Sequence, residues 1–283
     1  MLQFAAGLAR GSFRLLFSLL LLLPVSGAAP LAAADAPLRM HVLYGVSFNG
    51  FDIGSFEVDT EAEQQRYDLV ASAHLSFLLG AYTWEGRTHS FGLIAKEATR
   101  PSAYSFDFKS TLKAGSTTLL FSDGAVTRIS QLPAAIASPG AIPLNGDHLK
   151  GVLDPLSALL VLSRASANPC QRRIPIFDGR ERFDLLFSYK GETRVTELTA
   201  SGQPDVGVLC KVKYLPIAGH RVDATTEFMA ASEEIEVALR PIPAANLFVP
   251  YRISVPTRVG TASLSSKRIE IASPGQPQIA LLQ

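Results

Sequence analysis

The sequence contains little cysteine, and its charges balance. Its only cysteines are Cys170 and Cys210, which do not supply the usual four-ligand spacing of a zinc site. The 26 Lys and Arg residues nearly equal the 25 Asp and Glu residues, and the two signs are interspersed. This balance provides no basic surface for nucleic acid or anionic lipid. The main apolar run, Leu15–Leu23, is less than half of the ~20 residues that a membrane-spanning helix needs. We therefore expect no transmembrane segment and no nucleic-acid partner.

The apolar run instead predicts a secretory signal peptide. It follows two arginines and ends at Pro24, as the apolar part of a signal peptide does. Small residues provide two candidate cleavage sites, one after Ala28 and one after Ala34. We expect cleavage after Ala34, which removes residues 1–34 and leaves Asp35 as the first residue of the mature protein. The predicted location is the periplasm.

Residues 35–283 are enough for a single β-rich domain with its own core. Asn49-Gly50 and Asp123-Gly124 are turn pairs that favour tight hairpins, and Pro101 separates two of the expected strands. The uncharged, proline-rich segment 133–143 is expected to link an N-terminal meander to a C-terminal half. Alternation of apolar and polar residues predicts N-terminal strands over 40–48, 51–59, 66–78, 87–98, 102–110, 116–122 and 125–132.

The second half contains one predicted helix among further strands. Asp154 is a helix N-cap and Pro155 suits the first helical position, so a helix is expected over 155–165 with Leu156, Leu159 and Leu160 on one face. The predicted fold is mainly β: a curved antiparallel sheet or half-open barrel with one short central helix. The expected strands cover 174–177, 180–190, 194–200, 207–217, 234–242, 247–257 and 260–271.

The two cysteines are expected to form a disulfide. Both follow the signal peptide, and an exported protein meets an oxidising compartment in which thiols pair. The pair Cys170–Cys210 would close a loop within the C-terminal half. A metal site and an unpaired reactive thiol are the alternatives.

The stretch 168–191 raises the question of an active site. Asp178-Gly179 is expected to be a hairpin turn, followed by alternating charges at Arg180, Arg182 and Asp184. Such a row is typical of the solvated face of an antiparallel strand. The alternative is a functional surface that binds an anionic group.

A second loop could contribute to that surface. Gly219 implies a tight turn that presents His220 and Arg221. The candidate ligand or functional surface is therefore Asp178, Arg180, Arg182, His220 and Arg221.

Common catalytic and cofactor motifs are missing. The sequence contains no G-x-S-x-G, P-loop or G-x-G-x-x-G motif, and no two histidines at metal-ligand spacing. His148 could meet Asp147 and Asp154 near the helix, but these three fall short of a coordination shell. We expect no cofactor, no metal and no assigned catalytic residue.

Four motifs carry a family resemblance: "GVLDPLSALL", "IPIFDGRERFDL", "CKVKYLPIAGHR" and "VPYRISVPTRVGTA". In this order, with cysteines ahead of the second and opening the third, the chain resembles the exported bacterial family of unknown function DUF3108 from about Tyr44 to Ile269. The resemblance implies a periplasmic or envelope protein with a curved antiparallel sheet, similar by fold analogy to the lipoprotein carriers LolA and LolB. It implies no reaction.

Two functions fit these observations. The favoured one is a non-enzymatic envelope protein whose curved sheet binds a lipid, acyl chain or polypeptide, with a lipid or an envelope protein as its partner. The alternative is a hydrolase or lyase that uses His220 with the Asp178, Arg180 and Arg182 turn or with Asp184. The sequence does not indicate an oligomeric state.

Overall fold

The computed structural model describes residues 37–95, 98–134, 140–164, 166–198 and 200–283. The predicted signal peptide, both candidate cleavage sites and the expected start at Asp35 lie outside the described residues. Residues Asp35–Gln283 form one compact unit. Within the described ranges, no helix has the length and apolar character needed to cross a membrane.

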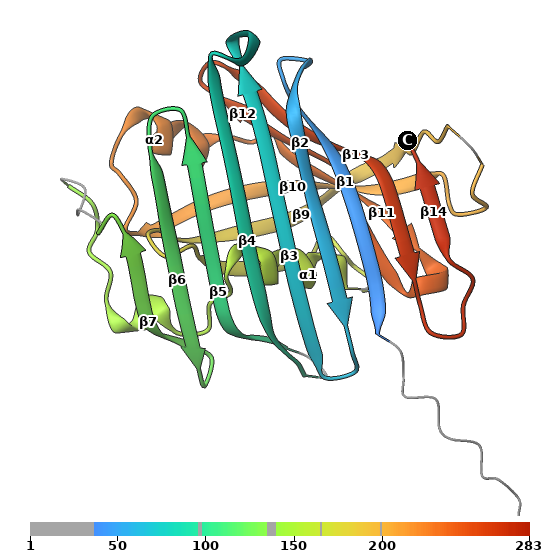
Figure 1. Cartoon of the computed structure of the whole chain (residues 1–283), viewed down its shortest axis with the longest axis horizontal. Coiled ribbons are helices and arrows are strands. Elements are labelled where there is room, and N and C mark those ends of the chain that lie inside the picture. Colours follow the sequence, from blue (N-terminus) through green and yellow to red (C-terminus); the bar gives the residue numbers. More distant parts are fainter. Residues whose placement is uncertain (1–36, 96–97, 135–139, 165, 199) are drawn as a thin grey trace, which may run out of the picture. The chain divides into compact units, whose positions relative to one another are not determined.

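The first half of the unit is an antiparallel meander (Figure 1). Its neighbouring strands follow one another in sequence, and the predicted hairpins at Asn49-Gly50 and Asp123-Gly124 are confirmed. Asn49, Gly50, Asp123 and Gly124 all have positive φ angles, as the tight turns require. The strands are β1 (Leu38–Phe48), β2 (Phe51–Ala62), β3 (Arg66–Phe77), β4 (Tyr82–Ile94), β5 (Thr99–Ser110), β6 (Ala114–Ser122) and β7 (Ala125–Leu132).

The second half continues the same sheet. Strand β13 pairs with β1, and the order then runs back through β12, β11, β10 and β9 to β8, so β7 and β8 are the two ends of the 14-stranded sheet formed by the described residues. Those two ends do not pair, which confirms the prediction of a mainly β, open antiparallel sheet. The strands are β8 (Arg172–Phe177), β9 (Arg182–Arg194), β10 (Val206–Ala218), β11 (Ile235–Ile242), β12 (Leu247–Thr257), β13 (Gly260–Ala272) and β14 (Ile279–Leu282).

The predicted helix lies between the two halves of the sheet. Helix α1 (Pro155–Ser163) begins at the expected cap, where Asp154 Oδ1 accepts hydrogen bonds from the backbone N–H groups of Leu156 and Ser157 at 3.0 Å. It contacts β3, β4 and β5 on one side and β8 and β12 on the other. The predicted face of Leu156, Leu159 and Leu160 is confirmed, because all three pack on the same core with β1 to β3, while Leu162 packs in the core around the disulfide.

A buried polar network attaches α1 to the first half. Asp154 Oδ2 accepts from Ser90 Oγ at 2.9 Å and from Ser157 Oγ at 2.5 Å, and the Tyr67 hydroxyl lies 2.7 Å from Ser157 Oγ. Burial raises the pKa of Asp154 despite these bonds and raises the pKa of Tyr67 to about 12. The network satisfies groups that would otherwise be costly to bury, so its role is structural.

The predicted disulfide is confirmed. Cys170 and Cys210 are bonded with their α-carbons 5.3 Å apart, and both lie in the second-half core with Ile174 and Val212. The bond joins the segment that precedes β8 to the middle of β10.

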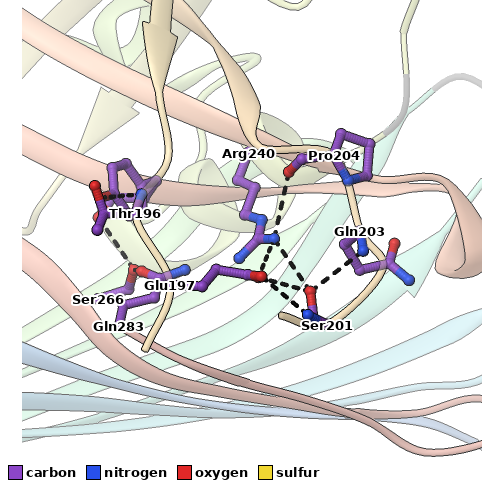
Figure 2. A network of polar contacts seen from close by, with 9 residues as sticks. Thr196, Glu197, Ser201, Gln203, Pro204, Arg240, Ser266 and Gln283 are labelled. Atoms are coloured by element: carbon purple, nitrogen blue, oxygen red, sulfur yellow. Dashed lines mark hydrogen bonds and ion pairs between the residues drawn. The ribbon is translucent and has the colours of Figure 1, made fainter. Parts of the chain in front are cut away.

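The expected strand 194–200 is wrong beyond Arg194, because residues 195–198 are not in a strand and Glu197 among them contacts a buried arginine (Figure 2). Arg240 on β11 is fully buried. It donates to Glu197 and to the carbonyl oxygen of Pro204, and Ser201 Oγ lies 3.5 Å away. With its amide oxygen turned toward Arg240, Gln283 accepts from Nη1 at 3.0 Å. A loop can bring these oxygens to the guanidinium, and the same network holds the C-terminus.

Other boundaries differ from the sequence prediction. Strand β4 begins at Tyr82 rather than at position 87. Pro101 lies inside β5 and pairs with Gly92. The register shifts there, and such an irregular pairing tolerates proline. Helix α2 (Ala224–Ala231), capped by Asp223, and strand β14 were not predicted. Helix α1 is the expected short central helix, and α2 is a second helix that the sequence did not reveal, because α2 lies on exposed loop surface and carries only a weak apolar pattern.

Candidate functional site

The turn between β8 and β9 spans Asp178–Glu181. Asp178 Oδ1 accepts from the backbone N–H groups of Arg180 at 2.8 Å and Glu181 at 2.7 Å. Gly179 has a φ of +101°, and a Cβ there would lie 2.4 Å from Cγ2 of Thr117 on β6. The turn therefore depends on glycine for its backbone conformation and for its approach to β6.

The Gly219 loop packs directly on this turn. A Cβ on Gly219 would lie 2.0 Å from the carbonyl oxygen of Arg180, and its φ is +79°. The loop exposes Arg221, as expected, but His220 is buried and its Nδ1 has no hydrogen-bond partner among the described residues. The expectation that the loop presents His220 is therefore wrong, since the close packing turns this side chain inward.

The alternating charges on β9 are not a solvated face. The Asp184 carboxylate is completely buried and accepts from Arg182, whose side chain is 11% exposed, and from Arg173 on β8, whose Nε lies 2.5 Å away. Arg182 also donates to the carbonyl oxygen of Phe183 at 2.6 Å. The two guanidinium groups compensate the burial of Asp184. Arg182 thus belongs to a structural ion cluster.

The two loops instead border a cavity of about 1050 Å³. It lies between the inner side of β5 to β7 and the turns that follow β8 and β10, where the two ends of the sheet approach each other. Three predicted site residues line it: Asp178, Arg180 and Arg221. His220 and Arg182 do not line it. The remaining lining residues are Tyr104, Phe106, Phe108, Lys113, Ala114, Ser116, Thr117, Gln131, Leu132, Pro133, Ala134, Pro155, Val222 and Asp223.

One wall of the cavity is aromatic. Tyr104, Phe106 and Phe108 occupy alternate positions of β5, so their side chains point to the same face of the sheet. The rings of Phe106 and Phe108 lie 5.7 Å apart, and Trp84 on β4 stacks beside Phe108 at 6.5 Å. This wall offers a continuous apolar surface.

The other end of the cavity is ionic, with cationic side chains at Lys113, Arg180 and Arg221. Its two acids are bonded to backbone N–H groups: Asp178 holds its own turn, and Asp223 caps α2 through Thr225 and Thr226. The three cations therefore outnumber the two acids at this end of the cavity.

Ionisable side chains also lie behind the Asp178 turn. Burial raises the pKa of Asp178, and burial together with Asp178 raises the pKa of Glu181. The Tyr214 hydroxyl donates to Glu181 Oε2 at 3.4 Å, and burial raises its pKa well above the ordinary value. Glu181 and Tyr214 were missed by the sequence analysis, although Glu181 directly follows the residues that it singled out.

The suggested meeting of His148 with two acids does not occur. His148 Nδ1 accepts from the backbone N–H of Asn145 at 3.3 Å, Asp147 pairs with Lys150, and Asp154 caps α1. Among the described residues, no group of three or more His, Cys, Asp and Glu side chains could hold a metal ion.

Comparisons with known proteins agree with the fold. The family described as "Protein of unknown function (DUF3108)" matches residues 43–266. The sequence matches none of the curated proteins with which it was compared. The chain is similar to the crystal structure of a beta-barrel-like protein of domain of unknown function DUF1849 from Brucella abortus, with a TM-score of 0.52 and 10% identity, over 85% of this chain and 100% of that chain. At that identity the likeness shows the fold alone.

Proposed function

The chain belongs to the DUF3108 family of proteins of unknown function, and we propose that it is a non-enzymatic envelope protein that binds an amphipathic lipid or acyl chain. The observation that carries this proposal is the cavity beside β5, whose aromatic wall faces a cationic end. Ligand pockets typically combine an apolar lining with a few polar groups that fix orientation. An acyl chain would lie along Phe106 and Phe108, and its anionic headgroup would face Arg180 and Arg221.

The size and position of the cavity support a small amphiphile over a polypeptide. Its volume of about 1050 Å³ is close to the upper range of small-molecule pockets. Helix α1 fills the space between the halves of the sheet, and Pro155 at its start lines the cavity. Helix α1 therefore bounds the ligand space along the sheet, which suits a short acyl chain better than an extended polypeptide.

The positions of the ionisable residues favour a binding function over a hydrolase or lyase. A general base must lie within hydrogen-bond reach of the group that it activates, but His220 is buried and does not line the cavity. Arg182 and Asp184 are bonded to each other. Asp178 lines the cavity, and its Oδ1 accepts from two backbone N–H groups of its own turn. Neither His220 nor Asp184 lines the cavity, so the proposed catalytic residues do not meet there as an acid–base pair.

The ligand is tested with a fluorescent long-chain fatty acid and the protein that begins at Asp35. We expect saturable binding, about tenfold weaker in Arg221→Gln because a charge-assisted bond is lost. Arg128→Gln is the matched control, since Arg128 is exposed and does not line the cavity. Native mass spectrometry of envelope-derived protein should show a copurifying lipid. No binding of the fatty acid together with no copurifying lipid would overturn the proposal.

The alternative function is tested at His220. In the described part of the chain its buried Nδ1 has no hydrogen-bond partner, so an apolar ring of similar size should be accepted in its place. We expect His220→Phe to fold and to bind the fatty acid as the unsubstituted protein does. A normally folded His220→Phe variant that has lost its cellular function while keeping ligand binding would favour the enzyme.

The envelope location is supported by the predicted signal peptide. Intact-mass measurement of protein recovered from the envelope fraction tests it. We expect the mass of a protein that begins at Asp35 or at the residue after Ala28. Retention of residues 1–34 would contradict export with cleavage.

A further inference from the structure

The hairpin turns at one end of the sheet form a continuous row. Antiparallel pairing places the β12–β13, β1–β2, β3–β4 and β5–β6 turns at the same end, seen at the top of Figure 1. Hydrogen bonds connect two of the turns to neighbouring strands: the backbone N–H of Asn49 donates to Thr261 on β13 at 2.9 Å, and that of Thr111 donates to Thr83 on β4 at 3.0 Å. The turns therefore lie along one edge of the unit.

Each of these turns exposes a large apolar side chain. Leu79 is fully exposed, and the others are between 76% and 82% exposed. At the opposite end, the turns Glu63–Gln65, Asp123–Gly124 and Pro243–Asn246 expose no large apolar side chain, and among the described loops there Leu198 between β9 and β10 is the exception at 78% exposed. The exposed residues at the first end, which we call the apolar tips, are Phe51, Leu78, Leu79, Leu112 and Val259.

The most exposed tip is also strained. Leu78 and Leu79 have φ angles of 50° and 56°, in the left-handed region that bulky side chains rarely adopt. Asparagine or glycine would occupy these positions at lower cost. Strain combined with exposure means that the two leucines do not stabilise the fold, which points to a use outside it.

The neighbours of the tips identify the kind of partner. Lys113 and Arg258 directly adjoin Leu112 and Val259, and Asp52 adjoins Phe51, so two cations and one acid flank the apolar groups. Tyr82 and Trp84 lie on β4 just below the Leu78–Leu79 turn, and these amphipathic rings favour the membrane–water interface. Separate projecting side chains suit a deformable lipid surface, while a protein partner would need a matching groove for each. The charges of the chain balance overall, but at the tips cations exceed acids, and apolar groups with such a local excess match an anionic bilayer surface.

We propose that the apolar tips dock the protein on the surface of an anionic phospholipid bilayer. The tips are distinct from the cavity, although Lys113 and Ala114, which line the cavity, directly follow Leu112. Docking would thus bring the cavity near the bilayer. The docking proposal depends only on the turn residues and does not require that the cavity holds a lipid.

Cosedimentation with vesicles tests the docking surface. The protein that begins at Asp35 is used, because the apolar run of the signal peptide would itself bind lipid. Vesicles contain phosphatidylcholine with phosphatidylglycerol, or phosphatidylcholine alone. We expect binding to the mixed vesicles, and binding at least about tenfold weaker after Leu78→Asn with Leu79→Asn, because two apolar side chains no longer enter the bilayer. The same double variant should melt at a higher temperature, since asparagine tolerates the left-handed conformation.

Two controls make the outcome specific. Leu198→Asn changes a leucine that is 78% exposed but lies on a loop beside β14, and it should leave vesicle binding unchanged. Lys113→Gln with Arg258→Gln should weaken binding to the mixed vesicles only. Failure of the unsubstituted protein to bind vesicles, or equal loss in Leu198→Asn and the double leucine variant, would overturn the proposal. Arg221→Gln should still bind vesicles, which separates this result from the cavity experiment.

Discussion

The Gln131 side chain donates a hydrogen bond from Nε2 to the carbonyl oxygen of Gly179 at 3.2 Å. Gln131 is on β7, at one end of the sheet, and Gly179 follows β8, at the other end. The open sheet is thus bridged by a side chain rather than by strand pairing. The candidate cavity lies beside this bridge, which makes the Gly179 turn part of both the fold and the cavity wall.

Gly179→Val should destabilise the fold. The substitution places a β-branched side chain at a φ of +101° and a Cβ 2.4 Å from Thr117, so we expect a loss of about 2–4 kcal/mol in the free energy of unfolding. Urea unfolding measures it. Gly124→Val is the control, because Gly124 has a φ of +75° but open space around its Cβ. Equal losses in the two variants would show that contact with Thr117 contributes nothing.

Removal of the disulfide should also lower stability. We expect Cys170→Ala with Cys210→Ala to lose about 2–4 kcal/mol, because the unfolded chain is no longer constrained. Chemical unfolding of oxidised and reduced protein provides an independent comparison. The double variant should be insensitive to reductant. Two titratable thiols in denatured, unreduced protein from the envelope would contradict the bond.

Asp184→Ala should be more damaging than the removal of one of its partners. It leaves the nearly buried Arg182 without its carboxylate, which typically costs about 3–5 kcal/mol. Arg173 is 65% exposed, so Arg173→Ala should cost less than about 1 kcal/mol. Urea unfolding of both variants checks the order. A greater loss in Arg173→Ala than in Asp184→Ala would show that Arg182 does not depend on the acid.

The sequence predicted elements whose local pattern and tertiary environment agree. The Asn49-Gly50 hairpin and the Asp154 cap depend on a few neighbouring residues, and both formed where expected. Segment 194–200 failed beyond Arg194 because its strand-like alternation was overridden by a distant buried charge, Arg240. The sequence pattern of that segment gives no sign of a contact with Arg240.

The sequence predicted only part of the candidate site, because the rest depends on contacts between distant segments. Asp178 and Arg180 were recognisable from their turn, and Arg221 from a glycine-marked loop. The aromatic wall was not, because Phe106 and Phe108 have the ordinary alternation of a core-facing strand. They line the cavity only because β5 lies opposite the turns that follow β8 and β10. His220 and Asp184 were misjudged because burial is a property of the packed sheet.

The pH dependence of stability should change when Asp178 is replaced by asparagine. Burial raises the Asp178 pKa in the folded protein above its unfolded value, so the folded state holds the proton more tightly. The resulting stability is complete below the ordinary pKa of about 4 and is lost as pH rises through the raised pKa. Asp178→Asn keeps an oxygen that can accept from Arg180 and Glu181. It should therefore be more stable than the unsubstituted protein at neutral pH, by about 1 kcal/mol, and the advantage should vanish toward pH ~4.

Urea unfolding over a pH series measures this difference, and Asp223→Asn provides a control of opposite sign. The backbone N–H of Thr226 lowers the Asp223 pKa, so the ionised acid stabilises the fold above its unfolded pKa, and this contribution is lost as pH falls through the lowered value. Asp223→Asn should accordingly be less stable than the unsubstituted protein at neutral pH and should match it in acid. If Asp178→Asn is instead less stable at neutral pH, the Asp178 carboxylate is a favourable anion in the folded turn, and its hydrogen bonds from the backbone outweigh its burial.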